Sequence, residues 1–151
     1  MILFSTILNP QCAATGVVAD DKDAALVAAV DLLAASGKVN NVGKLLEEIR
    51  SREHLASTAI GEGVAVPHAL CDALSETLLA VLHLAHPVDF DSIDGSPVDL
   101  LFLMAGPKGD TANHLKLLSK IARLLHDGDF RSAAREAPDG KSLAALLYEK
   151  D

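Results

Sequence analysis

The segment from Val98 to Met104, apolar except for Asp99, limits the possible folds of this chain more than any other part of its sequence. A nearly continuous apolar run indicates a strand buried on both faces, as in a sheet with helices on each side. Residues 78–84 form a second strong strand candidate, and 88–90 a shorter one. The turn signal Asp94-Gly-Ser-Pro97 precedes the apolar run.

Helical periodicity accounts for much of the remaining chain. Apolar residues recur at helical spacing from an N-cap at Asp20 or Asp21 to a stop at Gly37. The other expected elements are a brief strand at 16–19, a helix at 42–50, a long helix from about residue 114 that stops at Gly128, a short helix capped by Asp129, a turn at 138–140 and a last helix at 142–148. This order of strands and helices indicates a mixed α/β fold.

Composition restricts both organisation and partners. The chain has 151 residues, 50% of them apolar, which is enough for one sizeable core and favours a single domain. Its formal net charge of −8, without a basic cluster, argues against nucleic acid and anionic membrane surfaces as partners. The N-terminal MILFSTILNPQ fits neither a signal peptide nor a spanning helix, so a cytoplasmic protein is expected. Cys12 and Cys71 lack zinc-type spacing and are expected to be free thiols.

Four of the six histidines favour a structural interpretation. His54 lies among charged residues at an expected helix end, where exposure to solvent is typical. His126 lies in the last turn before Gly128 and suits the negative end of the helix dipole. His83 and His86 are three residues apart in or just after a strand, so their side chains point to opposite faces and make a poor metal pair.

His68 and His114 are the stronger candidates for chemistry. Pro67 fixes its own φ and biases Val66 towards extended geometry, so the His68 imidazole is presented from a stiff support. His114 lies in the first turn of the long helix, where unpaired N–H groups favour an anion such as a phosphoryl group and discourage protonation of the ring. On these residues alone, an unremarkable Pro-His pair and a solvent-facing helix-start histidine remain the plainer alternatives.

Several common catalytic motifs do not occur in the sequence. The run from Gly61 to Val66 starts like a dinucleotide-binding fingerprint, but Val66 stands where the third glycine is needed. A Walker sequence, a GxSxG elbow and an HExxH helix are all missing. Cys71 as a nucleophile with His68 as its base is disfavoured, because side chains three residues apart on an extended segment diverge.

Four separated blocks together resemble a known family. They are Arg52-Glu53 with Ser57-Thr58, GEGVAVPH at 61–68, DSIDGSPVDLLFLMAGP at 91–107, and His114-Leu115 opening a helix. In this order and spacing they resemble the EIIA domains of the bacterial phosphoenolpyruvate-dependent phosphotransferase system, in the fructose, mannitol and nitrogen-regulatory branch. The resemblance implies a single EIIA-type domain over residues 1–151, with a mixed parallel and antiparallel sheet of about five strands and helices on both faces.

The resemblance also implies a function and its residues. The chain would be a protein-histidine phosphotransferase, a phosphocarrier that takes a phosphoryl group on His68 from HPr or its nitrogen-branch counterpart. His114 matches the second active-site histidine, which stabilises the phosphoryl group, and Arg52 matches the active-site arginine. Neither a cofactor nor a metal is implied, because donor and acceptor are protein side chains. Positioning and electrostatics are the main demands of phosphoryl transfer, which agrees with these roles.

The branch of the family is harder to assign. Residues 87–102 look closer to the nitrogen-regulatory members, which favours a regulatory phosphocarrier whose phosphorylation state controls binding to target proteins. The alternative is a fructose- or mannitol-type component that passes the group to a cysteine of an EIIB domain, and a second is a binding module that is not phosphorylated. Ala69-Leu70 stands where many relatives have a small and then a basic residue, which leaves the partner proteins open.

Overall fold

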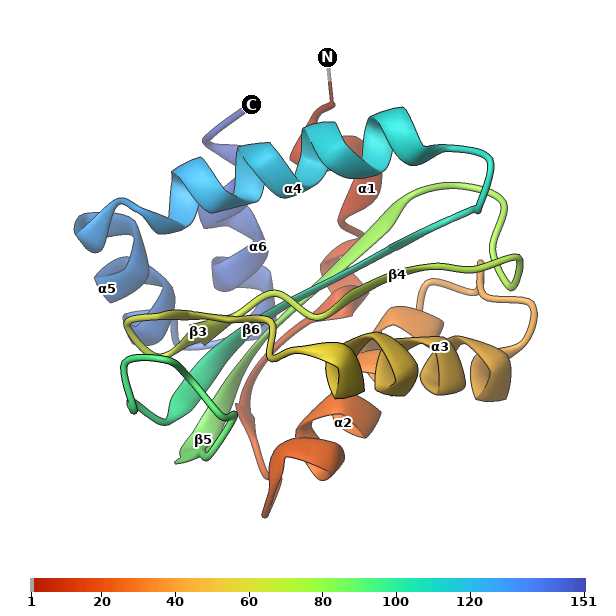
Figure 1. Cartoon of the computed structure of the whole chain (residues 1–151). Helices are drawn as coiled ribbons and strands as arrows, with labels where there is room; N and C mark the ends of the chain where they lie inside the picture. Colours follow the sequence, from red (N-terminus) through yellow and green to blue (C-terminus); the bar gives the residue numbers. More distant parts are fainter. Residues whose placement is uncertain (1) are drawn as a thin grey trace.

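A mixed six-stranded sheet forms the centre of the computed structural model, which describes residues 2–151 (Figure 1). The strand order is β1 (Ala13–Val17), β5 (Leu78–Val88), β6 (Val98–Gly106), β3 (Val64–Ala65) and β2 (Ala59–Gly61), and β4 (His68–Leu70) also pairs with β6. β5 and β6 are antiparallel, as are β2 and β3, whereas β1 runs parallel to β5, and β3 and β4 run parallel to β6. The predicted α/β class with a mixed sheet is therefore confirmed, with six strands instead of about five.

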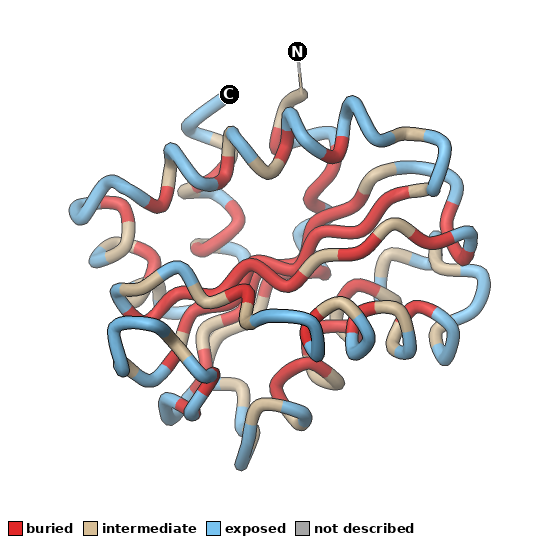
Figure 2. Tube along the Cα trace, viewed as in Figure 1, coloured by how far each residue is buried: buried red, intermediate tan, exposed pale blue. Residues whose placement is uncertain are grey.

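Helices cover both faces of this sheet (Figure 1). One face carries α2 (Lys22–Ala34) and α3 (Val42–Leu55), and the other carries α1 (Phe4–Ile7), α4 (Thr111–Leu125), α5 (Gly128–Glu136) and α6 (Gly140–Tyr148), with the 3₁₀ turn η1 (Pro10–Cys12) leading into β1. Figure 2 shows that the middle strands are buried, and residues 100–105 of β6 have no exposed surface. The apolar run is thus a strand buried on both faces, as predicted. No helix in residues 2–151 is long and apolar enough to cross a membrane.

The predicted helix boundaries were partly right. Asp21 caps α2 by accepting a hydrogen bond from the backbone N–H of Ala24. Asp127, not Asp129, caps α5, because its carboxylate accepts the N–H of Asp129. The second helix runs to Leu55 instead of residue 50, so it includes Arg52 and its neighbours.

Cys12 and Cys71 are buried free thiols, as expected.

Two predicted strands were misplaced. The first lies at Ala13–Val17 instead of 16–19, because the parallel pairing with β5 begins at Ala13 opposite Val81. Residues 88–90 are not a separate strand: Val88 ends β5 and pairs with Val98 across an irregularity in the ladder. The chain leaves the sheet after Val88, and Asp91 in the following loop has a left-handed φ of 57°.

The segment from Ala59 to Leu70 contains the three short strands β2, β3 and β4. Glu62 and Gly63, with φ values of 58° and 76°, make the two-residue turn between β2 and β3. Pro67 has no N–H and interrupts the pairing with β6 between β3 and β4, although its carbonyl accepts the N–H of Met104 at 3.0 Å. β4 then resumes the pairing, with His68 opposite Met104. This arrangement puts His68 beside the break in the ladder.

Candidate functional site

The three site residues predicted from sequence lie around one open pocket of about 450 Å³. The pocket is lined by Glu48, Ser51, Arg52, Leu55, His68, Ala69, Leu70 and His114. His68 comes from β4, Arg52 from the end of α3 on one face of the sheet, and His114 from α4 on the other (Figure 1). The pocket thus brings together residues from the sheet and from both helical layers, although these residues are far apart in sequence.

One hydrogen bond determines which nitrogen of His68 is nucleophilic. Nδ1 lies 2.8 Å from the carbonyl oxygen of Val66, two residues earlier in the chain. A carbonyl oxygen can only accept, so we assign the proton of the neutral ring to Nδ1. Nε2, on the opposite side of the ring, then holds the lone pair. His68 therefore offers Nε2 to an electrophile.

His114 is suited to remain uncharged beside His68. His114 is only 6% exposed, and the centroids of the His68 and His114 rings are 5.5 Å apart. Burial, and secondarily the proximity of His68, lower the pKa of His114 below its ordinary value. Its Nδ1 is buried without a hydrogen-bond partner in residues 2–151. Because a buried N–H without a partner is rarer than an unpaired acceptor, we assign the proton to Nε2, which makes that nitrogen a neutral donor.

Arg52 contributes the positive charge of the pocket wall. It lies in the last turn of α3 and is half-buried. Its Nη1 donates a hydrogen bond of 3.0 Å to the carbonyl oxygen of Ala56, the C-cap residue of the helix. A guanidinium has five N–H donors, so this contact leaves others to bind an anion.

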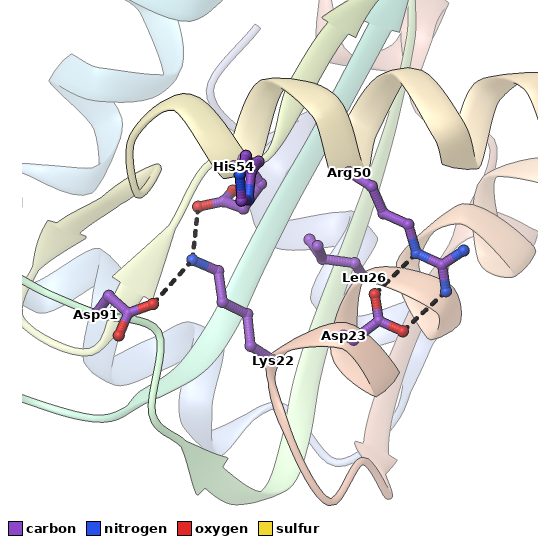
Figure 3. A pocket seen from close by; sticks show the side chains of 7 residues that line it. Lys22, Asp23, Leu26, Arg50, His54 and Asp91 are labelled. Atoms are coloured by element: carbon purple, nitrogen blue, oxygen red, sulfur yellow. Dashed lines mark hydrogen bonds and ion pairs between the residues drawn. The ribbon is translucent and has the colours of Figure 1, made fainter.

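The remaining four histidines do not line this pocket. His54 is exposed and lines a second pocket, of about 430 Å³, together with Lys22 (Figure 3). His126 is the exposed C-cap residue of α4, and His86 is exposed on β5. His83 lies 3.1 Å from a carboxylate oxygen of Asp99. Within residues 2–151, no three His, Cys, Asp or Glu side chains are grouped so that they could hold a metal ion.

Glu53 is a component of this region to which the sequence assigned no role. The buried residues of α3 are Leu45, Ile49 and Glu53, spaced four apart on one face of the helix. A carboxylate therefore occupies a position where the helical pattern expects an apolar side chain. This position on the apolar stripe was the one sequence signal that Glu53 is buried. A buried acid needs partners inside the protein, so the signal also indicated a structural role.

The fold and the pocket together define an α/β domain of the EIIA type. The family model described as "Phosphoenolpyruvate-dependent sugar phosphotransferase system, EIIA 2" matches residues 6–150, and the chain belongs to this family, as its sequence motifs predicted.

Similar proteins come from more than one branch of the family. A nitrogen regulatory protein of Pseudomonas aeruginosa is 36% identical over 99% of this chain and 97% of its own length. The fructose-specific EIIA component of Haloferax volcanii is 33% identical over 85% of this chain and 83% of its own length. Among solved structures, nitrogen regulatory protein IIA-Ntr from Neisseria meningitidis superimposes with a TM-score of 0.83 and 28% identity, covering 94% of this chain and 97% of the other.

Proposed function

We propose that this chain is a phosphocarrier that accepts a phosphoryl group on Nε2 of His68 from a histidine of an HPr-type protein. The observation that carries the proposal is the hydrogen bond between His68 Nδ1 and the Val66 carbonyl, which leaves Nε2 with the lone pair. His68 lines the same open pocket as His114 and Arg52, which supports the approach of a phosphoryl group to its ring.

The proposed step is an in-line displacement at phosphorus. The lone pair of Nε2 forms the new N–P bond while the N–P bond to the donor histidine breaks, and the donor imidazole keeps that electron pair. The Nδ1 proton of His68 stays hydrogen-bonded to the Val66 carbonyl, which stabilises the positive charge that develops on the ring. Arg52 and the Nε2–H of His114 are the groups proposed to hold the phosphoryl oxygens.

Exposed apolar side chains beside the pocket favour a protein as the phosphoryl donor. Leu55, on the pocket wall, is 80% exposed, and Leu115, next to His114 on α4, is 58% exposed. Exposed apolar surface that adjoins a reactive residue supports docking of a protein partner there. A protein partner would cover both and bring its own histidine to Nε2 of His68.

Regulation is the preferred biological role. The similarity to a nitrogen regulatory protein over almost the full length of both chains supports a cytoplasmic regulator whose phosphorylation state controls its targets. The similarity to a fructose-specific component supports, as the second candidate, transfer to an EIIB cysteine during sugar uptake.

Labelled phosphoenolpyruvate, with Enzyme I and an HPr-type carrier, tests the proposal directly. The unaltered protein and His54→Gln, a control at an exposed histidine outside the pocket, should acquire an acid-labile, base-stable label, and His68→Gln should not. Equal labelling of His68→Gln would refute the proposal, and lack of label on the unaltered protein would favour a binding module. Onward transfer to a fructose-type EIIB cysteine would favour the sugar-transport role over the regulatory one.

A further inference from the structure

We propose that Glu53 is a positioning residue that holds both His68 and Arg52 in place through the backbone of residues 56–58. The inference rests on the proposed function, because it concerns the same pocket. It assigns a purpose to the buried carboxylate at the end of α3, which does not itself line that pocket.

The Glu53 side chain is 4% exposed, and both of its oxygens are engaged. Oε2 accepts the backbone N–H of Thr58 at 2.7 Å, and Oε1 accepts the hydroxyl of the same residue at 2.5 Å. The ammonium of Lys22 lies 3.1 Å from Oε2 (Figure 3). These contacts compensate for the burial of a charge and fix Thr58 relative to α3.

From Thr58, the first connection leads to His68. The carbonyl oxygen of Thr58 accepts the backbone N–H of Val66 at 3.0 Å. The carbonyl of Val66 is in turn the group that accepts from Nδ1 of His68 at 2.8 Å. Glu53 is therefore linked to the contact that selects the tautomer of the nucleophile through its own hydrogen bond to the Thr58 N–H and one backbone hydrogen bond, from Val66 to Thr58.

A second connection leads from the same segment to Arg52. The Ala56 carbonyl that accepts from Arg52 Nη1 lies two residues before Thr58. The intervening Ser57 is held as well, since its hydroxyl donates to the carbonyl oxygen of Phe90 at 2.5 Å. With Thr58 bound to Glu53 and Ser57 bound to Phe90, the Ala56 carbonyl has a defined position from which to orient the guanidinium.

Lys22 completes the arrangement from α2. Its ammonium also lies 3.4 Å from a carboxylate oxygen of Asp91 (Figure 3). The same ammonium lies 4.8 Å from the centre of the Phe90 ring. The cation that neutralises Glu53 is thus attached to the same loop that receives the Ser57 hydroxyl. The end of α3, the start of α2 and the loop at 90–91 converge on the segment that supports the pocket.

The test measures phosphoryl transfer from the HPr-type carrier with Glu53→Ala, Glu53→Gln and Thr58→Val. We expect Glu53→Ala to lower kcat by up to about 100-fold, because a displacement of about 1 Å in a reacting group has an effect of this size. Glu53→Gln keeps the shape of the side chain but loses the ion pair with Lys22, so its kcat should lie between those of Glu53→Ala and the unaltered protein. The KM for the carrier should stay within about twofold, since Leu55 and Leu115 are unchanged.

A spectroscopic readout separates this inference from the proposed function. Imidazole ¹⁵N shifts of the unphosphorylated protein report the His68 tautomer, which should be Nδ1–H in the unaltered protein and mixed in Glu53→Ala. If Glu53→Ala does not fold, Glu53→Gln and Thr58→Val still provide the comparison. If the unaltered protein does not accept a phosphoryl group, the proposed function is wrong. The ¹⁵N shifts that report the His68 tautomer still test whether Glu53 positions the ring.

Asp99→Asn is the matched control, because Asp99 is a half-buried carboxylate that binds Arg135 and His83 away from the pocket. It should lower stability and leave both kcat and the His68 shifts unchanged. Folded Glu53 variants with unaltered kcat and unaltered ¹⁵N shifts would overturn the inference. An equal loss of kcat in Asp99→Asn would also overturn it, since the effect would then follow from stability alone.

Discussion

The imidazole rings of His68 and His114 lie with their centroids 5.5 Å apart and their planes inclined by 53°. One ring belongs to a strand and the other to a helix that packs on the sheet, so the contact exists only in the folded chain. Burial lowers the pKa of His114, and the neighbouring His68 lowers it further, which favours a neutral ring beside the proposed nucleophile.

This relationship predicts the effect of removing the second histidine. His114→Ala should slow phosphoryl transfer by about 100- to 1000-fold, because it removes a donor to the phosphoryl oxygens and leaves the nucleophile intact. Rapid-quench measurements should find the loss in both directions of transfer, with His68 still fully labelled at long times. Rates equal to those of the unaltered protein in both directions would show that His114 has no part in the reaction.

The lowered pKa of His114 also predicts how stability depends on pH. The unfolded chain protonates this ring near its ordinary pKa of 6.5, and the folded protein only at lower pH. Between the folded and the unfolded pKa of His114, the unfolded state binds more protons than the folded state, so the free energy of unfolding decreases as the pH falls. Above about pH 6.5 the ring is neutral in both states, and stability no longer depends on its titration. In urea unfolding, the free energy of unfolding of the unaltered protein minus that of His114→Gln should therefore decrease from about pH 7.5 to about pH 5.5. A constant difference over this range would contradict the prediction.

The turn between β2 and β3 should not tolerate a side chain at Gly63. A Cβ there would lie 2.7 Å from Nη2 of Arg135, and φ is +76°. Gly63→Ala should lower the free energy of unfolding by about 2 kcal/mol, through backbone strain and displacement of a side chain that donates to the Glu62 carbonyl. Gly37→Ala is the control, because its φ is +74° but the space around it is open, so only about 1 kcal/mol should be lost.

The central strand should dominate stability. Leu101 is completely buried on β6, so Leu101→Ala should lower the free energy of unfolding by about 2–5 kcal/mol, measured by urea denaturation. Ile93 has the same number of side-chain carbons but is fully exposed, and Ile93→Ala should change stability by less than about 0.5 kcal/mol. Similar losses for the two variants would contradict the assignment of the core.

Neither cysteine should react while the protein is folded. Burial raises the pKa of the Cys12 thiol, despite a weaker opposing backbone hydrogen bond, and Cys71 has no exposed surface. An aromatic disulfide reagent at about pH 8 should release almost no chromophore from the native protein and two equivalents per chain after unfolding in urea. Rapid release from the native protein would show that one of the thiols is accessible.

Local sequence patterns were sufficient for most of the secondary structure. The apolar run that became β6 and the helical stripes of α2 and α4 report burial through their own periodicity, which depends little on the rest of the chain. The strand limits were less predictable, because Ala13 and Val88 are in the sheet only through partners on other strands. Pairing partners are a tertiary property, and propensity alone does not contain them.

The family motifs contained in the sequence itself selected His68, His114 and Arg52 from the other candidates. Only the tertiary structure brings these three residues into one pocket and decides, through the Val66 carbonyl, which nitrogen of His68 holds the lone pair. It alone also reveals that Glu53 is buried against Thr58, where its position on an apolar stripe was the one local sign. The physical reason is that burial, tautomer and hydrogen-bond partner are set by neighbours in space, which a linear pattern does not specify.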